Sequence, residues 1–116
     1  MMRGKGKRLT IYLDESHHWH GKPTVEVLID RLHHREVRGV TVLKGVAGFG
    51  EDGTLHTTKI LRLAERLPVV VVVVETEEVV NRILPEISDI VEHGLIEVSD
   101  TEIVQCCEHA RRRKDG

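Results

Sequence analysis

Hydrophobic and polar positions change their spacing several times along the first half of the chain. Leu9–Leu13 alternates apolar and polar residues, which is the pattern of a short strand. From Pro23 onward the spacing becomes that of one helix face, with apolar residues at Val25, Leu28, Ile29 and Leu32. We expect Gly39 to end this helix. A β-branched strand over residues 40–46 then leads into a cluster of glycines.

The second half of the chain begins with six consecutive valines, Val69–Val74. The run is too short to span a membrane and too β-branched for a helix, so it predicts a central strand. Thr76 then suits the N-cap of a second helix, whose apolar face is Val80, Ile83, Leu84, Ile87 and Val91.

Three further signals concern the end of that helix and the residues after it. Pro85 lies inside the pattern and is expected to kink or divide the helix, which Gly94 should end. The stretches 95–98 and 102–106 then have strand character, with a break expected near residues 99–100. Residues 58–67 fit a strand and a helix equally well, and the pattern does not decide between them.

The predicted order β-α-β-β-α-β is that of the ferredoxin-like α+β fold, a four-stranded antiparallel sheet with two helices on one face. Successive side chains of a strand point to opposite faces, so the valine run sends three valines to each face. The two helices cover only one face. We therefore expect self-association to cover the other, in preference to a loop or the C-terminal strand folding over it.

Length and charge place the chain in a broad class. Its 116 residues suit one domain over 1–116, with short basic tails expected at 1–8 and 111–116. A net charge of -2 and three aromatic residues give no basic field or stacking platform for nucleic acid. Without a secretory pattern, and with only Cys106 and Cys107, a reduced cytoplasmic setting is expected. In a strand these two side chains would point to opposite faces.

Several motifs occur in an order that resembles a known family. The chain has Glu15-Ser16, then Trp19, then Gly21-Lys22-Pro23, and later Gly39–Gly50, with His56-Thr57 and Lys59. These motifs resemble the PII-like family catalogued as domain of unknown function 190, which is related to the nitrogen-regulatory PII signalling proteins.

The resemblance implies a homotrimer with ligand clefts between subunits. It also implies an adenine nucleotide as ligand (AMP, ADP, ATP or a cyclic form), and signalling through the 50–59 loop to a partner such as a membrane transporter. The residues that it places at the ligand are Thr41 at the base, Gly45, Gly48, Phe49 and Gly50 towards the phosphates, and Lys59. Residues 97–100 lack the Gly-Asp-Gly-Lys loop of PII proteins, so we expect AMP or a cyclic nucleotide to bind more readily than ATP.

A histidine cluster supports an alternative function. His17, His18 and His20 offer imidazole ligands for a divalent metal, as in a trimer that resembles the divalent-cation tolerance proteins. The competing interpretation is a solvated loop in which Trp19 packs on the domain. No spacing typical of a nucleophilic triad or a zinc protease is present, so the sequence does not predict an enzyme.

Overall fold

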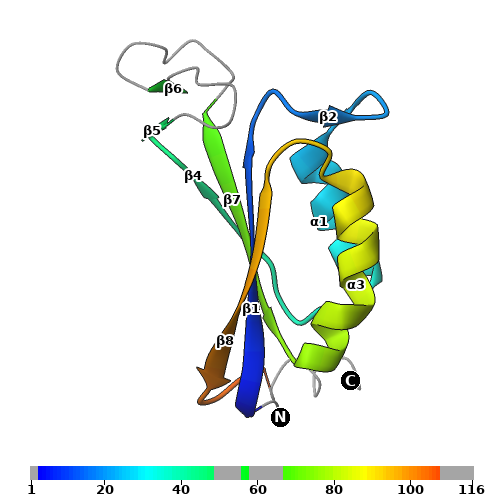
Figure 1. Ribbon diagram of the computed structural model, residues 1–116, viewed down its shortest axis with the longest axis vertical. Helices are drawn as coiled ribbons and strands as arrows, with labels where there is room; N and C mark the ends of the chain where they lie inside the picture. The colour runs from blue at the N-terminus through cyan, green and yellow to red at the C-terminus, as the bar shows by residue number, and fades with distance from the viewer. Residues whose placement is uncertain (1–2, 49–55, 58–66, 108–116) are drawn as a thin grey trace, which may run out of the picture.

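The computed structural model describes residues 3–48, 56–57 and 67–107. Two layers are visible in Figure 1, a sheet and a pair of helices that cover one of its faces. The sheet contains the strands β1 (Gly4–Asp14), β4 (Thr41–Lys44), β7 (Pro68–Glu75) and β8 (Leu95–Ile103). The helices are α1 (Thr24–His34) and α3 (Glu77–Ile90). Two short hairpins are formed by β2 (His18–Trp19) with β3 (Lys22–Pro23), and by β5 (Ala47–Gly48) with β6 (His56–Thr57).

The strand order β4-β7-β1-β8, with every neighbouring pair antiparallel, confirms the predicted ferredoxin-like α+β fold. β1 and β7 occupy the centre of the sheet, and β4 and β8 form its edges. Ile11 of β1 pairs with Val71 of β7 on one side and with Ile96 of β8 on the other. Residues in register share a face, so these pairs define which residues lie under the helices.

The valine run of β7 alternates between the two faces, as its period predicts. Val69, Val71 and Val73 are buried under the helices, whereas Val70, Val72 and Val74 are only half-buried on the opposite face. We call that opposite face the outer face. In Figure 1 no helix lies against it.

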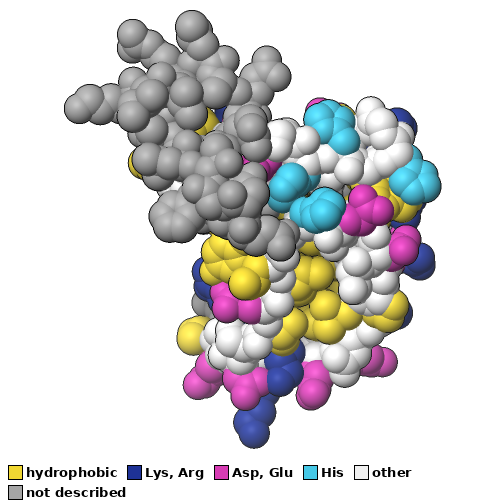
Figure 2. Space-filling view, turned by 45° about the horizontal axis from the view of Figure 1, so that its top comes forward, with side chains coloured by type: hydrophobic (Ala, Val, Ile, Leu, Met, Phe, Trp, Pro, Cys, Tyr) yellow, Lys and Arg dark blue, Asp and Glu magenta, His cyan; other side chains and the backbone are white. Residues whose placement is uncertain are grey.

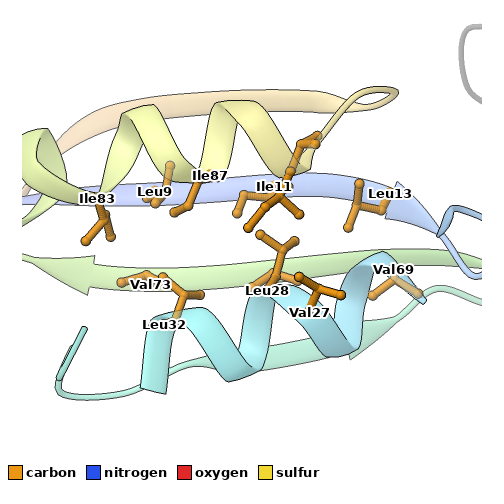
Figure 3. Packing of buried hydrophobic residues seen from close by; sticks show 13 residues of the cluster. Leu9, Ile11, Leu13, Val27, Leu28, Leu32, Val69, Val73, Ile83 and Ile87 are labelled. Atoms are coloured by element: carbon orange, nitrogen blue, oxygen red, sulfur yellow. The ribbon is translucent and has the colours of Figure 1, made fainter. Parts of the chain in front are cut away.

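The hydrophobic core lies between the sheet and the two helices (Figure 3). Its buried members come from β1, α1, β7 and α3 and are Leu9, Ile11, Leu13, Val27, Leu28, Leu32, Val69, Val71, Val73, Ile83, Ile87, Ile90 and Val91. Each fully buried aliphatic side chain stabilises the fold by about 1.5–3 kcal/mol, so the inner face accounts for most of the stability of this domain.

α3 begins where the sequence predicts and runs through its proline. The side chain of Thr76, the N-cap, accepts a hydrogen bond from the backbone N–H of Val79 at 3.3 Å. Of the two effects expected of Pro85, division of the helix is wrong, because α3 is continuous from Glu77 to Ile90. Pro85 leaves the carbonyl of Asn81 without its helical donor, and because Asn81 is on the exposed side, water can serve it.

Both helices end earlier than their glycines suggest. α1 ends at His34 with Arg35 as C-cap, and Glu36 then adopts a positive φ of 60°, so Gly39 is not the stop. α3 ends at Ile90, before Gly94. At Gly94 a Cβ atom would lie 2.6 Å from the carbonyl oxygen of Tyr12, so a glycine is needed there for close approach to β1.

The two ends of the sheet also differ from the prediction. Residues 4–8, expected in a solvated tail, belong to β1 and pair with β7 and β8; residues 111–116 lie outside the described ranges. β8 continues without a break through residues 99–100 and ends at Ile103, before residue 106. Continuity follows from its register with β1, in which Lys7 lies opposite Asp100 and forms an ion pair with it.

A buried carboxylate, that of Glu75, lies on the helix side of the sheet at the end of β7. Glu75 is 1 % exposed and accepts hydrogen bonds from the backbone N–H of Arg38 at 2.6 Å and from its guanidinium at 3.2 Å. A third donor is the N–H of Thr76, at 3.3 Å. The carboxylate thereby joins the α1–β4 connection to the start of α3.

Neither α1 nor α3 is long and apolar enough to cross a membrane, and the other described residues form no such helix.

Candidate functional site

The residues predicted to contact a ligand follow one edge of the sheet. Thr41 is exposed on β4 and lies opposite Val72, so its side chain belongs to the outer face. Gly45 follows the last residue of β4, and Gly48 lies in β5. Phe49, Gly50 and Lys59 lie outside the described residues. Among the described residues, Thr41 thus lies on the edge strand β4, and the two glycines lie just beyond its end.

Gly45 is required for packing rather than for donating to a ligand. Its backbone N–H already donates to the carbonyl of Pro68 at 2.7 Å. A Cβ atom at position 45 would lie 2.7 Å from Cγ of Pro68, so only a glycine allows the two segments to come this close. The amide of Gly45 is thus engaged within the chain, at the turn where β4 ends.

A carboxylate that the sequence motif contained, but to which it gave no role, lies beside this turn. Glu15 Oε2 is 2.7 Å from the ammonium nitrogen of Lys44, the last residue of β4. Its Oε1 accepts a hydrogen bond from the backbone N–H of Leu67 at 3.2 Å, and the N–H of Glu15 donates to the carbonyl of Leu67 at 3.0 Å. Glu15 thus contacts both ends of the segment between β4 and β7. The motif Glu15-Ser16 marked the position, but only the structure shows these partners.

Beside Glu15 the surface is hollowed on the helix side of β4. The hollow has a volume of about 370 Å³, and its lining is Glu15, His17, Pro23, Val25, Glu26, Val42, Lys44 and Val69. Apolar walls with a few charged groups at the rim are typical of small-molecule sites. The lining comes from β3, α1, β4 and β7 and from the segment that follows β1, so a ligand here would touch both layers of the fold.

The three histidines of the predicted metal cluster have different partners. The ring of His17 lies 6.1 Å from that of His93, Nδ1 of His18 is 2.7 Å from the carbonyl of Ser16, and the ring of His20 stacks on Trp19 at 3.9 Å. Histidine side chains gather at one end of the face shown in Figure 2. Even so, the described part of the chain holds no group of three His, Cys, Asp or Glu side chains that could bind a metal.

Trp19 packs on the domain instead. It is partly buried against the core, and the guanidinium of Arg31 lies over its ring at 5.3 Å from the centroid. This arrangement supports the interpretation of residues 17–20 as a loop fastened to α1 by its tryptophan.

Two acidic residues of β8, Glu97 and Asp100, are engaged with β1. The hydroxyl of Tyr12 donates to Glu97 at 2.7 Å, and this hydrogen bond raises the pKa of Tyr12. Lys7 binds Asp100, which lowers the pKa of that carboxyl and raises the pKa of the lysine. At this end of β8, Lys7 is thus already neutralised by a protein carboxylate.

Cys106 and Cys107 were expected on opposite faces of a strand, and this is wrong. Both residues follow the end of β8, and Cys107 adopts a positive φ of 70°.

Comparison with known proteins assigns the family. The family model described as "DUF190: Uncharacterized ACR, COG1993" matches residues 6–103. A UPF0166 protein of Aquifex aeolicus is 35% identical over 100 residues, which is 86% of this chain and 94% of the relative. A UPF0166 protein of Methanocaldococcus jannaschii is 34% identical over 100 residues, which is 85% of this chain and 92% of the relative.

Solved structures of similar fold are PII-like. The structure of CPII from Thiomonas intermedia K12, a nitrogen regulatory PII-like protein bound to ADP, AMP and bicarbonate, superimposes with a TM-score of 0.67 at 21% identity, covering 87% of this chain and 90% of that one. The apo form of CPII gives a TM-score of 0.59 at 21% identity, with 88% and 95% covered. The resemblance inferred from the motifs is thereby confirmed, and the chain belongs to the DUF190 family, with a PII-like, ferredoxin-like fold.

Proposed function

We propose that this chain is a PII-like regulatory protein that binds an adenine nucleotide with few phosphates between the subunits of a homotrimer. A partner protein, such as a transporter, would then respond to the conformation of the 50–59 loop. The observation that carries the proposal is that Thr41, on the edge strand β4, is exposed on an outer face that neither α1 nor α3 covers.

The outer face has the composition of a subunit interface. Val70 and Val72 are half-buried, Tyr12 and Leu43 are 41% and 53% exposed, and register places all four on the same side of the sheet. Continuous apolar surface of this kind is typical of protein–protein contacts. A neighbouring copy on this face would bring its own residues up to the edge of β4 and complete a cleft there.

The structures of CPII supply the class of ligand. They contain ADP and AMP, and their fold matches this chain over most of its length. In this chain the partners of Glu97 and Asp100 are Tyr12 and Lys7, so the β8 segment presents acids, one of which already neutralises the nearby lysine. A triphosphate is disfavoured by these acids more than a monophosphate, which supports the preference for AMP or a cyclic form.

Calorimetric titration tests the proposal. AMP, ADP, ATP and cyclic AMP are titrated into the protein, each with and without magnesium. We expect saturable binding of one nucleotide per chain, with AMP or cyclic AMP tighter than ATP. Thr41→Val removes the hydroxyl and keeps the branched shape, and it should weaken every adenine nucleotide. The matched control Thr101→Val, on β8, should leave affinity unchanged. If none of the four nucleotides binds, the proposed function is wrong.

A further inference from the structure

The ion pair of Lys44 and Glu15 joins an exposed side chain to one that is held by further hydrogen bonds. The carboxylate is fixed, because Oε1 accepts from the N–H of Leu67 at 3.2 Å, the N–H of Glu15 donates to the carbonyl of Leu67 at 3.0 Å, and the side chain is 26% exposed. The lysine side chain is 61% exposed, and its ammonium reaches Glu15 Oε2 at 2.7 Å. If the pair separates, Lys44 is the residue that can move.

Lys44 is within reach of a ligand at the proposed site. It lies three residues after Thr41 on β4, which is about 10 Å along a strand. β4 is an edge strand, so a long side chain that starts on the helix side can pass around the edge. A ligand with its base near Thr41 would therefore place an anionic group at the turn beside Lys44.

The pair is also easy to exchange. Ion pairs between exposed side chains contribute little to stability, because water and salt screen them. A phosphate monoester carries more negative charge than a single carboxylate and offers several acceptor oxygens. A phosphate monoester therefore competes well with Glu15 for the ammonium of Lys44, because that side chain is exposed to water.

We propose that Glu15 acts as an internal competitor that holds Lys44 until the anionic group of the ligand displaces it. This inference rests on the proposed function and deepens it, because it assigns the phosphate contact and the residue that regulates it. Glu15 would be a positioning residue, acting on the ligand through Lys44.

The exchange has a structural consequence at the base of the segment between β4 and β7. Without ligand, one carboxylate links the end of β4 through Lys44 to the start of β7 through Leu67. With ligand, the link to Leu67 remains and the link to Lys44 is lost. Binding at the β4 edge thereby changes how the two ends of that segment are held together.

Calorimetry with AMP and with adenosine tests the proposal in four proteins: wild type, Glu15→Gln, Lys44→Met and the double variant. Glutamine keeps an acceptor for Leu67 but no longer holds the ammonium by charge. Glu15→Gln should tighten AMP about two- to fivefold, the effect expected when an exposed ion pair is removed as competitor. Lys44→Met should weaken AMP about fivefold or more. In the Lys44→Met background, Glu15→Gln should have clearly less effect.

Two controls separate competition from other causes. Glu26→Gln removes a charge from the same hollow and leaves the Lys44–Glu15 pair in place, so it should change AMP affinity less than Glu15→Gln. Adenosine lacks the phosphate, and its affinity should be unaffected by Glu15→Gln. A merely structural role for Glu15 would instead weaken both ligands.

The outcomes distinguish this inference from the function on which it rests. Suppose that the wild-type protein binds AMP. The inference is wrong, and the proposed function stands, if Glu15→Gln weakens AMP binding or leaves it unchanged. The same holds if Glu15→Gln tightens AMP binding equally in the Lys44→Met background. If wild type binds no adenine nucleotide, both are wrong.

Discussion

The two faces of the sheet differ in burial although one run of valines supplies both. On the helix side, Val71 and Val73 are fully buried, and α1 and α3 pack on them. On the outer face, Val70, Val72 and Val74 stay half-buried. The inner face is complete within one chain, so it specifies the fold. The valines of the outer face are covered by neither helix, and we propose that another copy of the chain covers them.

The edges of the sheet add to this contrast. Residues proposed to bind the ligand lie where the outer face meets the edge of β4, whereas the buried ion pair of Glu75 with Arg38 lies on the inner face. Polar groups on the inner face serve to hold elements together. At the end of β4, by contrast, the exposed Lys44 pairs with Glu15, and we propose that a ligand displaces this partner.

The largest difference between the two faces is expected when Asp replaces Val71, on the helix side, or Val72, on the outer face. Val71→Asp buries a carboxylate under the helices, at a cost comparable to the whole stability of a small domain, about 5–15 kcal/mol, so this variant should be unfolded. Val72→Asp should keep its circular dichroism spectrum but lose assembly, because the carboxylate can reach water in a monomer. Light scattering after gel filtration measures the second effect. If both variants behave alike, the distinction between the faces is wrong.

Removing the side-chain partner of the buried Glu75 tests how much the contact between Arg38 and Glu75 contributes to stability. Arg38→Met leaves a carboxylate that is 1 % exposed without its guanidinium, although the N–H of residue 38 still donates. We expect a loss of about 1–3 kcal/mol in the free energy of unfolding, measured by urea titration at equal protein concentrations. Arg8→Met, on the outer face, is the matched control and should cost less. An equal loss would show that the burial of Glu75 adds nothing.

Glu86 of α3 forms ion pairs with Arg31 of α1 and with Arg35, the C-cap residue of α1, and acidification tests these contacts. Hydrogen bonds from Arg35 and Arg31 lower the pKa of Glu86 below its ordinary value of 4.5. A depressed pKa means that this contribution to stability is present above pH 4.5 and is lost as the pH falls through the folded-state value. Glu86→Gln should therefore lower the melting temperature by a few degrees at pH 7 and by less at acidic pH. Asp89→Asn, on the exposed side of α3, removes a charge from the same helix without removing these ion pairs and is the matched control.

The smallest expected effect is on the outer face, where the chain has its single tyrosine. The hydrogen bond to Glu97 raises the pKa of Tyr12 above 10.0, because it favours the protonated phenol. Absorbance of the phenolate in an alkaline titration reports this group alone. Glu97→Gln should lower the apparent pKa towards the ordinary value, and an unchanged titration would contradict the contact.

Most of the fold could be predicted from the sequence because local patterns and the core agree. The valine alternation, the Thr76 N-cap and the strand order were all correct. Errors came where tertiary contacts decide: Gly94 is retained for its approach to β1 rather than as a helix stop, and residues 4–8 become strand because β7 and β8 flank them.

The candidate site was less predictable. Motif resemblance selected Thr41 and Gly45, but periodicity says nothing about a contact such as that of Glu15 with Lys44, which depends on how β1 meets the end of β4. The histidine cluster illustrates a different limit of the sequence. Three histidines close in sequence suggested a metal site, yet their backbone turns them to different partners.

The mass of the wild-type protein in solution tests the central claim most directly, that the outer face is an interface between copies of the chain. Light scattering coupled to gel filtration at micromolar concentration should give about three times the chain mass of 13.2 kDa. A monomer at that concentration would contradict the account, because the outer face would then be exposed to water and no cleft between subunits would exist.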